Sequence, residues 1–173
     1  VKKIGEMAFY KCNAKNVTLK NIDSIGESSF EKSKINSVAL QNIGTIDSWA
    51  FMRCGAKSGV LKRVKKMKKG VFMACTQLKT VKISGVKTIG SSAFEDCGKL
   101  EKVFLGEATQ TLGECCFSGC MKLKKLVMTS KKKLNWKIDQ RIWQRNKLKI
   151  KPFNSCDSLK HVYLKSGKVS KSI

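Results

Sequence analysis

One short stretch decides the fold: residues 89–105 read IGSSAFEDCGKLEKVFL. In its first half, a serine follows the corner at Gly90, and Ala93, Phe94 and Cys97 are apolar residues at helical spacing. This pattern predicts one capped helical turn. The second half alternates apolar and polar residues, which predicts a short strand. The stretch therefore predicts a strand and a helical turn joined at a glycine.

Copies of this stretch recur along the chain, and each copy is marked by a phenylalanine. Seven of the eight phenylalanines recur at gaps of 21, 21, 21, 22, 23 and 36 residues. They are Phe9, Phe30, Phe51, Phe72, Phe94, Phe117 and Phe153. A small residue usually precedes each one, and a cysteine usually follows three positions later. A fixed period in the twenties is typical of a solenoid, in which each repeat buries its apolar side by stacking on its neighbours.

The repeats predict a single solenoid domain over residues 1–173. We expect seven short strands, at residues 17–19, 35–40, 61–67, 78–83, 100–105, 123–128 and 159–164. Residues 129–149 are predicted to form an insertion between the sixth and seventh repeats, because the last gap between phenylalanines is the longest.

The pattern I-G-x-x-A-F-x-x-C-x-x-L-x-x-V-x-L resembles the BspA-type leucine-rich repeat over residues 4–164, apart from the insertion. The resemblance implies an α/β fold, a right-handed solenoid of about seven repeats, each with a short strand and a helical or 3₁₀ turn opposite. It also implies a bacterial or protist protein, secreted or at the cell surface, that adheres to host proteins, matrix or other microbes. The family has no catalytic residues to carry over.

The chain is strongly basic. It has 36 Lys and Arg against 12 Asp and Glu, a formal net charge of +24, and most of the excess lies after residue 60. Such a field attracts polyanions, for which nucleic acid, sulfated glycan, a teichoic-acid-like polymer and an acidic membrane are candidates. Only four basic residues are Arg. Because lysine acts as a point charge, the bias fits loose attraction or solubility rather than specific base reading.

The strand faces are the first candidate binding site. Residues between the apolar positions of a strand point away from the core. Stacked strands would turn the basic ones into a stripe made of Lys15, Lys62, Arg63, Lys65, Lys79, Lys82, Lys102, Lys124, Lys125 and Lys160. Phe104, His161 and Tyr163 are predicted to interleave with the stripe, and Tyr163 joins the candidate ligand-binding residues. Solenoids bind along such faces, although a face that only keeps the array soluble is the alternative.

The insertion is the second candidate site. Residues 121–152 hold 12 Lys and Arg and a single acidic residue. Trp136, Trp143, Arg141 and Arg145 mix aromatic and basic side chains there, which suits stacking on bases or sugars, or a membrane interface. Insertions in repeats are often binding loops. The alternative is that both tryptophans pin the loop onto the solenoid core.

Six of the eight cysteines share one repeat position. They are Cys12, Cys54, Cys75, Cys97, Cys120 and Cys156, and Ser33 takes this position in the second repeat. Because free cysteine behaves as a small hydrophobe, we expect an inward-facing column of reduced thiols. A disulfide between neighbouring repeats is the alternative. Cys115 takes the slot of Ser92 and is expected to be exposed.

We expect no enzyme activity, cofactor or metal. His161 is the single histidine, the acidic residues are scattered, and no C-x-x-C pair or Cys-His grouping occurs. No apolar run is long enough to cross a membrane. The chain begins at Val1 without a leader-like stretch, and we interpret it as a mature fragment.

The sequence thus predicts a monomeric, non-catalytic binding or adhesion module for a host or matrix protein. One alternative is a polyanion binder for sulfated glycan or nucleic acid. Another is a structural scaffold with no ligand of its own. The resemblance favours the cell surface or the secreted fraction as its location.

Overall fold

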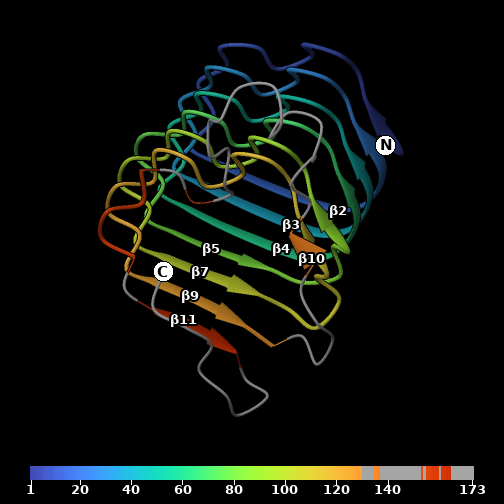
Figure 1. Ribbon diagram of the computed structural model, residues 1–173. Helices are drawn as coiled ribbons and strands as arrows, with labels where there is room; N and C mark the ends of the chain where they lie inside the picture. Colours follow the sequence, from blue (N-terminus) through green and yellow to red (C-terminus); the bar gives the residue numbers. More distant parts are fainter. Residues whose placement is uncertain (130–134, 137–152, 154, 160, 165–173) are drawn as a thin grey trace, which may run out of the picture.

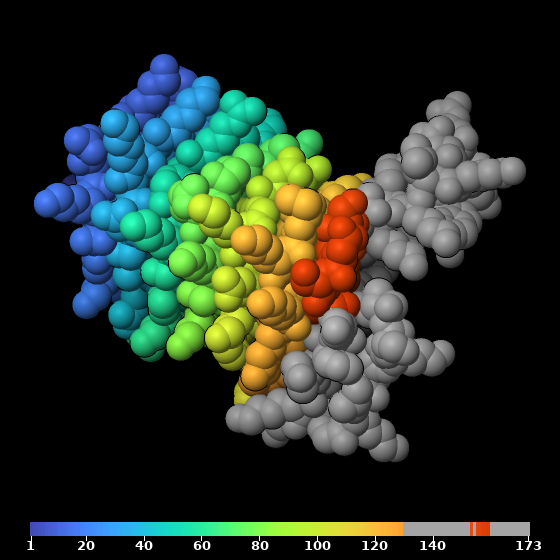
Figure 2. Space-filling view, turned by 90° about the vertical axis from the view of Figure 1, so that its left-hand side faces the viewer, coloured from blue at the N-terminus to red at the C-terminus, as the bar shows by residue number. Residues whose placement is uncertain are grey.

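The chain folds into a parallel β-solenoid of about six turns (Figure 1). The computed structural model describes residues 1–129, 135–136, 153, 155–159 and 161–164. In the space-filling view, each turn forms one band across the surface, and the bands follow one another from the N-terminus (Figure 2).

The described strands fall into two parallel sheets. The first sheet holds, in spatial order, β1 (Lys3–Ile4), β2 (Asn16–Ile25), β3 (Ser37–Ile46), β4 (Ser58–Met67), β5 (Thr80–Ile83), β7 (Lys102–Leu105), β9 (Lys125–Met128) and β11 (His161–Leu164). The second sheet holds β10 (Asn135–Trp136), β8 (Thr111–Leu112) and β6 (Thr88–Ile89). Sequence order is therefore also stacking order in the first sheet, as a solenoid requires.

The register places equivalent residues of neighbouring repeats side by side. Leu40, Leu61 and Ile83 form one such column through β3, β4 and β5, and all three are buried. In β5, Lys82 lies exposed between the buried Val81 and Ile83. The predicted alternation of inward and outward residues is thus correct in this strand.

The first strands extend further than the sequence pattern predicts. β2, β3 and β4 each run for ten residues and pass a corner at Asn21, Asn42 and Arg63, which adopt φ of 57°, 56° and 54°. Gly85, with φ of 88°, takes the corresponding place between β5 and β6. Asparagine tolerates the left-handed conformation, so the chain turns here without a glycine or proline to mark the corner.

The predicted helical turns are not found. The residues that the structure describes contain no helix, so the helical part of the α/β assignment and the count of seven repeats are not confirmed. Instead, two residues flanking each phenylalanine are left-handed; for Phe94 they are Ser92 and Asp96, with φ of 56° and 58°. These turns carry apolar residues at helical spacing without being helices.

Hydrogen bonding explains this turn. The N–H groups of Ser92, Phe94 and Asp96 donate to carbonyls of the next repeat, at 2.8 Å each. The N–H groups of the residues between and after them donate three positions back within their own repeat, at 3.2–3.3 Å. Every second N–H group therefore donates to the next repeat, whereas in a helix these hydrogen bonds would form within one segment.

The phenylalanines form one stack through the core, here called the phenylalanine ladder. Neighbouring rings from Phe9 to Phe153 lie 4.9–5.6 Å apart between centroids and within 10° of parallel. The rings of Phe51, Phe72, Phe94 and Phe117 are fully buried. The spacing of the rings is close to that of stacked strands. Neighbouring repeats are therefore separated by a similar distance on the strand side and on the turn side of the solenoid.

A second column of side chains bonds to the ladder. The thiols of Cys75, Cys97 and Cys120 donate to the Phe carbonyl of the preceding repeat, at 3.0–3.1 Å. The hydroxyl of Ser33 does the same to Phe9, at 2.9 Å. This shared donor role explains why serine replaces cysteine there. The cysteines face inward as predicted, but Cys115 is half-buried rather than exposed.

We expect Phe94→Ala to lower the free energy of unfolding by about 3–5 kcal/mol, because it leaves a cavity in a fully buried stack. Phe104→Ala, at a half-buried outward position of β7, should cost far less. Urea denaturation of both variants measures the difference. Equal losses would contradict the register of β7.

We expect thiol labelling of the native protein to be confined to the half-buried Cys12, Cys115 and Cys156, and to reach the five buried cysteines only on unfolding. Burial raises the pKa of the Cys115 thiol, helped by Glu95 and Glu114, so labelling should accelerate as the pH rises toward that pKa. Mass spectrometry across a time course gives the order. Cys115→Ser should remove one of the three sites labelled in the native protein, and equal rates at all eight sites would refute the assignment.

Candidate functional site

The outward residues of β4, β5, β7 and β9 form two rows across the first sheet. The first row holds Ser58, Thr80, Lys102 and Lys125. The second row holds Val60, Lys82, Phe104 and Val127. Lys102 and Lys125 are direct neighbours in register, while the second row is mostly apolar.

A groove of about 200 Å³ opens on this face. We call it the strand-face groove and define it by Val60, Lys62, Lys82, Ser84, Phe104 and Val127. Val60, Phe104 and Val127 are half-buried, so their outer surfaces remain in contact with solvent. The groove therefore combines an apolar floor with exposed lysines.

The ammonium group of Lys82 lies over the aromatic ring of Phe104 in the floor of the groove. Its Nζ lies 5.6 Å from the centroid of the Phe104 ring, within reach of a cation–π interaction. This contact holds a positive charge against an aromatic surface. A ligand group that pairs with Lys82 would therefore also lie close to Phe104.

The structure divides the predicted basic stripe into separate groups. Lys62 and Lys82 line the groove, and Lys102 and Lys125 lie beside it in the first row. Lys79 and Lys124 are exposed just before β5 and β9, and Lys15 is exposed just before β2. Arg63 and Lys65 are exposed on the part of β4 at and beyond the corner.

The apolar second row was missed from the sequence. Val60 and Val127 occupy outward positions, where only charged and aromatic residues had been considered. The sequence feature that indicates this row is a pair of adjacent apolar residues, as in Val60–Leu61 and Val127–Met128. Such adjacent apolar pairs mark a strand that is apolar on both faces.

The candidate residues near the C-terminus are described only in part. Lys160, Arg141, Trp143 and Arg145 lie outside the described residues. Tyr163 pairs with Val127 in register, which continues the second row along the backbone.

Two residues of the predicted insertion form a strand that pairs with a strand of the repeats. Trp136 pairs with Leu112 as part of β10, so residues 135–136 form a strand of the second sheet. The other residues of the insertion predicted over 129–149, apart from Thr129, lie outside the described residues, and the insertion stays a prediction.

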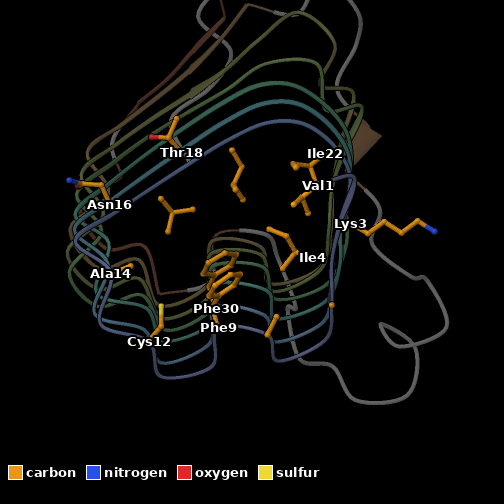
Figure 3. Close-up of a pocket in the computed structure, with 14 residues that line it drawn as sticks. Val1, Lys3, Ile4, Phe9, Cys12, Ala14, Asn16, Thr18, Ile22 and Phe30 are labelled. Atoms are coloured by element: carbon orange, nitrogen blue, oxygen red, sulfur yellow. The ribbon is translucent and has the colours of Figure 1, made fainter.

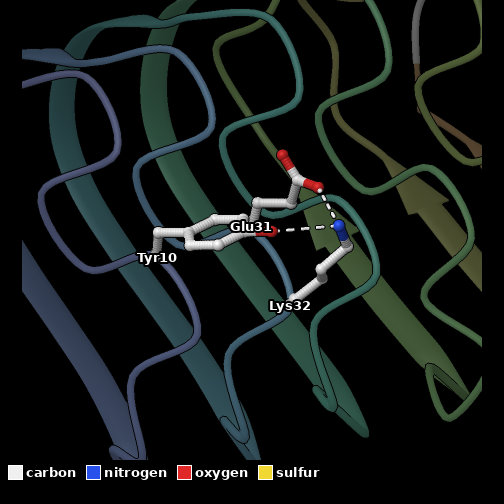
Figure 4. A network of polar contacts seen from close by, with 3 residues as sticks. All are labelled: Tyr10, Glu31 and Lys32. Atoms are coloured by element: carbon white, nitrogen blue, oxygen red, sulfur yellow. Dashed lines mark hydrogen bonds and ion pairs between the residues drawn. The ribbon is translucent and has the colours of Figure 1, made fainter.

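A polar network joins the first two repeats on the turn side (Figure 4). The Lys32 ammonium donates to the Tyr10 hydroxyl at 3.0 Å and pairs with the Glu31 carboxylate at 3.3 Å. The bond from Lys32 lowers the pKa of Tyr10, and the bond to Tyr10, followed by that to Glu31, raises the pKa of Lys32. The network is an exposed tie between neighbouring turns and was not expected from the sequence.

An apolar hollow of about 520 Å³ lies at the N-terminal end (Figure 3). Its lining includes Ile4, Phe9, Val17 and Ile22, which occupy core columns of the repeat. Phe9 is 46% exposed, whereas the equivalent rings of later turns are covered. The hollow is thus the uncovered end of the core, and Lys3 points away from it.

The described residues contain neither a candidate metal cluster nor a candidate membrane-spanning helix. Within them, no three His, Cys, Asp or Glu side chains come close enough together to hold a metal ion. The described part of the chain also has no helix of the length and apolarity needed to cross a membrane.

The family model of the BspA-type leucine-rich repeat region matches residues 2–124 and 45–167, in six copies. The chain belongs to the BspA-type leucine-rich repeat family. This confirms the resemblance inferred from the sequence, and the family is generally non-catalytic. The BspA-type pattern supplies the buried columns, while the groove residues vary from one turn to the next.

No curated protein matches this BspA-type chain. The crystal structure of a leucine rich cell surface protein from Faecalibacterium prausnitzii A2-165 aligns with a TM-score of 0.46 and 14% identity. The alignment covers 96% of this chain and 64% of that one, so the chain spans less than two thirds of that protein.

We expect Arg63→Asn to raise the free energy of unfolding by about 0.5–1 kcal/mol, because asparagine adopts the left-handed corner conformation at lower cost than arginine. It would also continue the side-chain bond that joins Asn42 to Asn21 at 2.7 Å. Thermal denaturation measures the gain. Arg63→Val should destabilise, and a loss with Arg63→Asn would contradict this account.

Proposed function

We propose that the chain is a non-catalytic adhesion module that binds a protein ligand at a cell surface or after secretion. The observation that carries this proposal is the strand-face groove, in which the aromatic ring of Phe104 lies half-exposed between valines and lysines. Membership of a generally non-catalytic repeat family supports it. Protein interfaces commonly place an apolar or aromatic centre inside a polar rim.

The sheet behind the groove favours recognition of a preformed shape. Each of β5, β7 and β9 is hydrogen-bonded to a neighbour on both sides, and its inward residues are fully or almost fully buried. A surface supported in this way changes little on binding, which lowers the entropy cost of association.

A polyanion is the second candidate ligand. The neighbouring exposed lysines Lys102 and Lys125 favour it, since two adjacent positive charges attract phosphate or sulfate groups. Binding of this kind falls steeply with salt, because it depends on counterion release.

We expect Phe104→Ala to weaken binding to a matrix-protein ligand at least tenfold while leaving the fold intact, because it removes the centre of the groove. The measurement is biosensor binding of the intact chain to a panel of immobilised matrix proteins. Met121→Ala is the matched control, since Met121 is 57% exposed and lies outside the groove. Equal weakening by both variants would refute the assignment.

Retention on heparin and on duplex DNA across a salt gradient tests the second candidate. The comparison is between Glu reversal of Lys82, Lys102 and Lys125 and Glu reversal of the exposed Lys34, Lys87 and Lys122, which lie outside these strands. Salt-steep retention lost only in the first variant would favour the polyanion. Absence of binding to every matrix would favour a scaffold without a ligand.

A further inference from the structure

We infer that the strand-face groove takes an extended polypeptide segment in which one large apolar side chain is flanked, two residues away on each side, by acidic side chains. This inference rests on the proposed function and specifies the chemistry of its ligand. It is carried by the size of the groove, the order of its rows and the charge around it.

The size of the groove fits a single side chain. Its volume is about 200 Å³. Cofactor and drug-sized ligands occupy pockets of ~300–1,000 Å³, so this groove is too small for them. Val60, Phe104 and Val127 supply apolar surface from three strands, and an aromatic or long aliphatic side chain would cover it.

The charged residues of the strands around the floor are all basic. Lys62 and Lys82 line the groove, and Lys102 and Lys125 lie in the adjacent row. The strands β4, β5, β7 and β9 contain no Asp or Glu. The nearest acidic residues along the chain, Glu101 and Glu107, lie just outside the two ends of β7. An acidic ligand segment thus meets complementary charge across the strands.

The spacing of the rows gives the pattern of the ligand. Lys102 precedes Phe104 by two residues on β7, and Lys62 follows Val60 by two residues on β4, two strands away, so the two basic positions lie at opposite corners of the apolar row. Side chains two residues apart on one face of an extended chain are separated by ~6.6 Å, in the ligand as in the sheet. An acidic–x–apolar–x–acidic segment that crosses the strands obliquely, from Lys102 on β7 toward Lys62 on β4, therefore matches the two basic positions and the apolar row between them.

Fluorescence anisotropy with synthetic peptides tests this inference on the intact chain. The probe carries the core Glu-Ser-Phe-Ser-Glu, and the controls carry Lys-Ser-Phe-Ser-Lys and Glu-Ser-Ser-Ser-Glu. We expect the probe to bind at least tenfold more tightly than either control. Equal binding of the two Glu-containing peptides would overturn the inference, since charge alone would then explain the affinity.

A charge exchange separates recognition from loss of folding. Lys82→Glu with Lys102→Glu should weaken the Glu-flanked probe at least tenfold and strengthen the Lys-flanked peptide, an inversion that unfolding cannot produce. Lys87→Glu, at an exposed site outside the groove, should change neither. Failure of all peptides, with Phe104→Ala still abolishing binding to a matrix protein, would overturn this inference and leave the proposed function standing. Failure of both measurements would overturn both.

Discussion

The exchange of amide hydrogen bonds between neighbouring turns is the interaction on which the structure depends. At each ladder phenylalanine from Phe9 to Phe94, three alternate N–H groups donate to carbonyls of the next repeat. A single repeat therefore leaves these groups without partners, and burying them unpaired would be costly. The same exchange fixes the distance between turns, so rings, thiols and strands all stack with one period. The flat apolar row of the groove follows from this common spacing.

The buried columns add packing to that hydrogen-bonded frame. The carbonyls of Phe9, Phe51, Phe72, Phe94 and Phe117 each accept two donors, the N–H of the cysteine three residues on and a thiol or hydroxyl from the next repeat. The phenylalanine carbonyl, a polar group inside an apolar core, thus receives its second hydrogen bond from the small side chain of a cysteine or serine. Cysteine and serine both meet this requirement, which a purely apolar residue would not. The recurrence of cysteine is explained by this bond as well as by its hydrophobicity.

The period, the buried phenylalanines and the inward cysteines could be predicted from the sequence, because each depends on repetition at one position. The turn could not, since Ala93, Phe94 and Cys97 face the core equally well in a helix and in a turn with left-handed residues at Ser92 and Asp96. The candidate site was found in part. Alternation gave the outward lysines, but their grouping depends on the register between strands, which brings Lys102 beside Lys125 and sets Phe104 between Lys82 and Val127.

The bonds between repeats that are donated at the phenylalanine turns, by each phenylalanine and its two left-handed neighbours, all run in one sense along the solenoid axis. Their N–H groups point toward the C-terminal end and their carbonyls toward the N-terminal end, from the first described turn to the sixth. The stacked phenylalanine turns form one arc of the solenoid. The peptide dipoles of this arc add head to tail, as they do in an α-helix, but across successive repeats instead of along one segment. The arc is a polar column: its N-terminal end presents acceptors and its C-terminal end presents donors. Two such arcs can continue one another head to tail, whereas head-to-head contact would set like groups against each other.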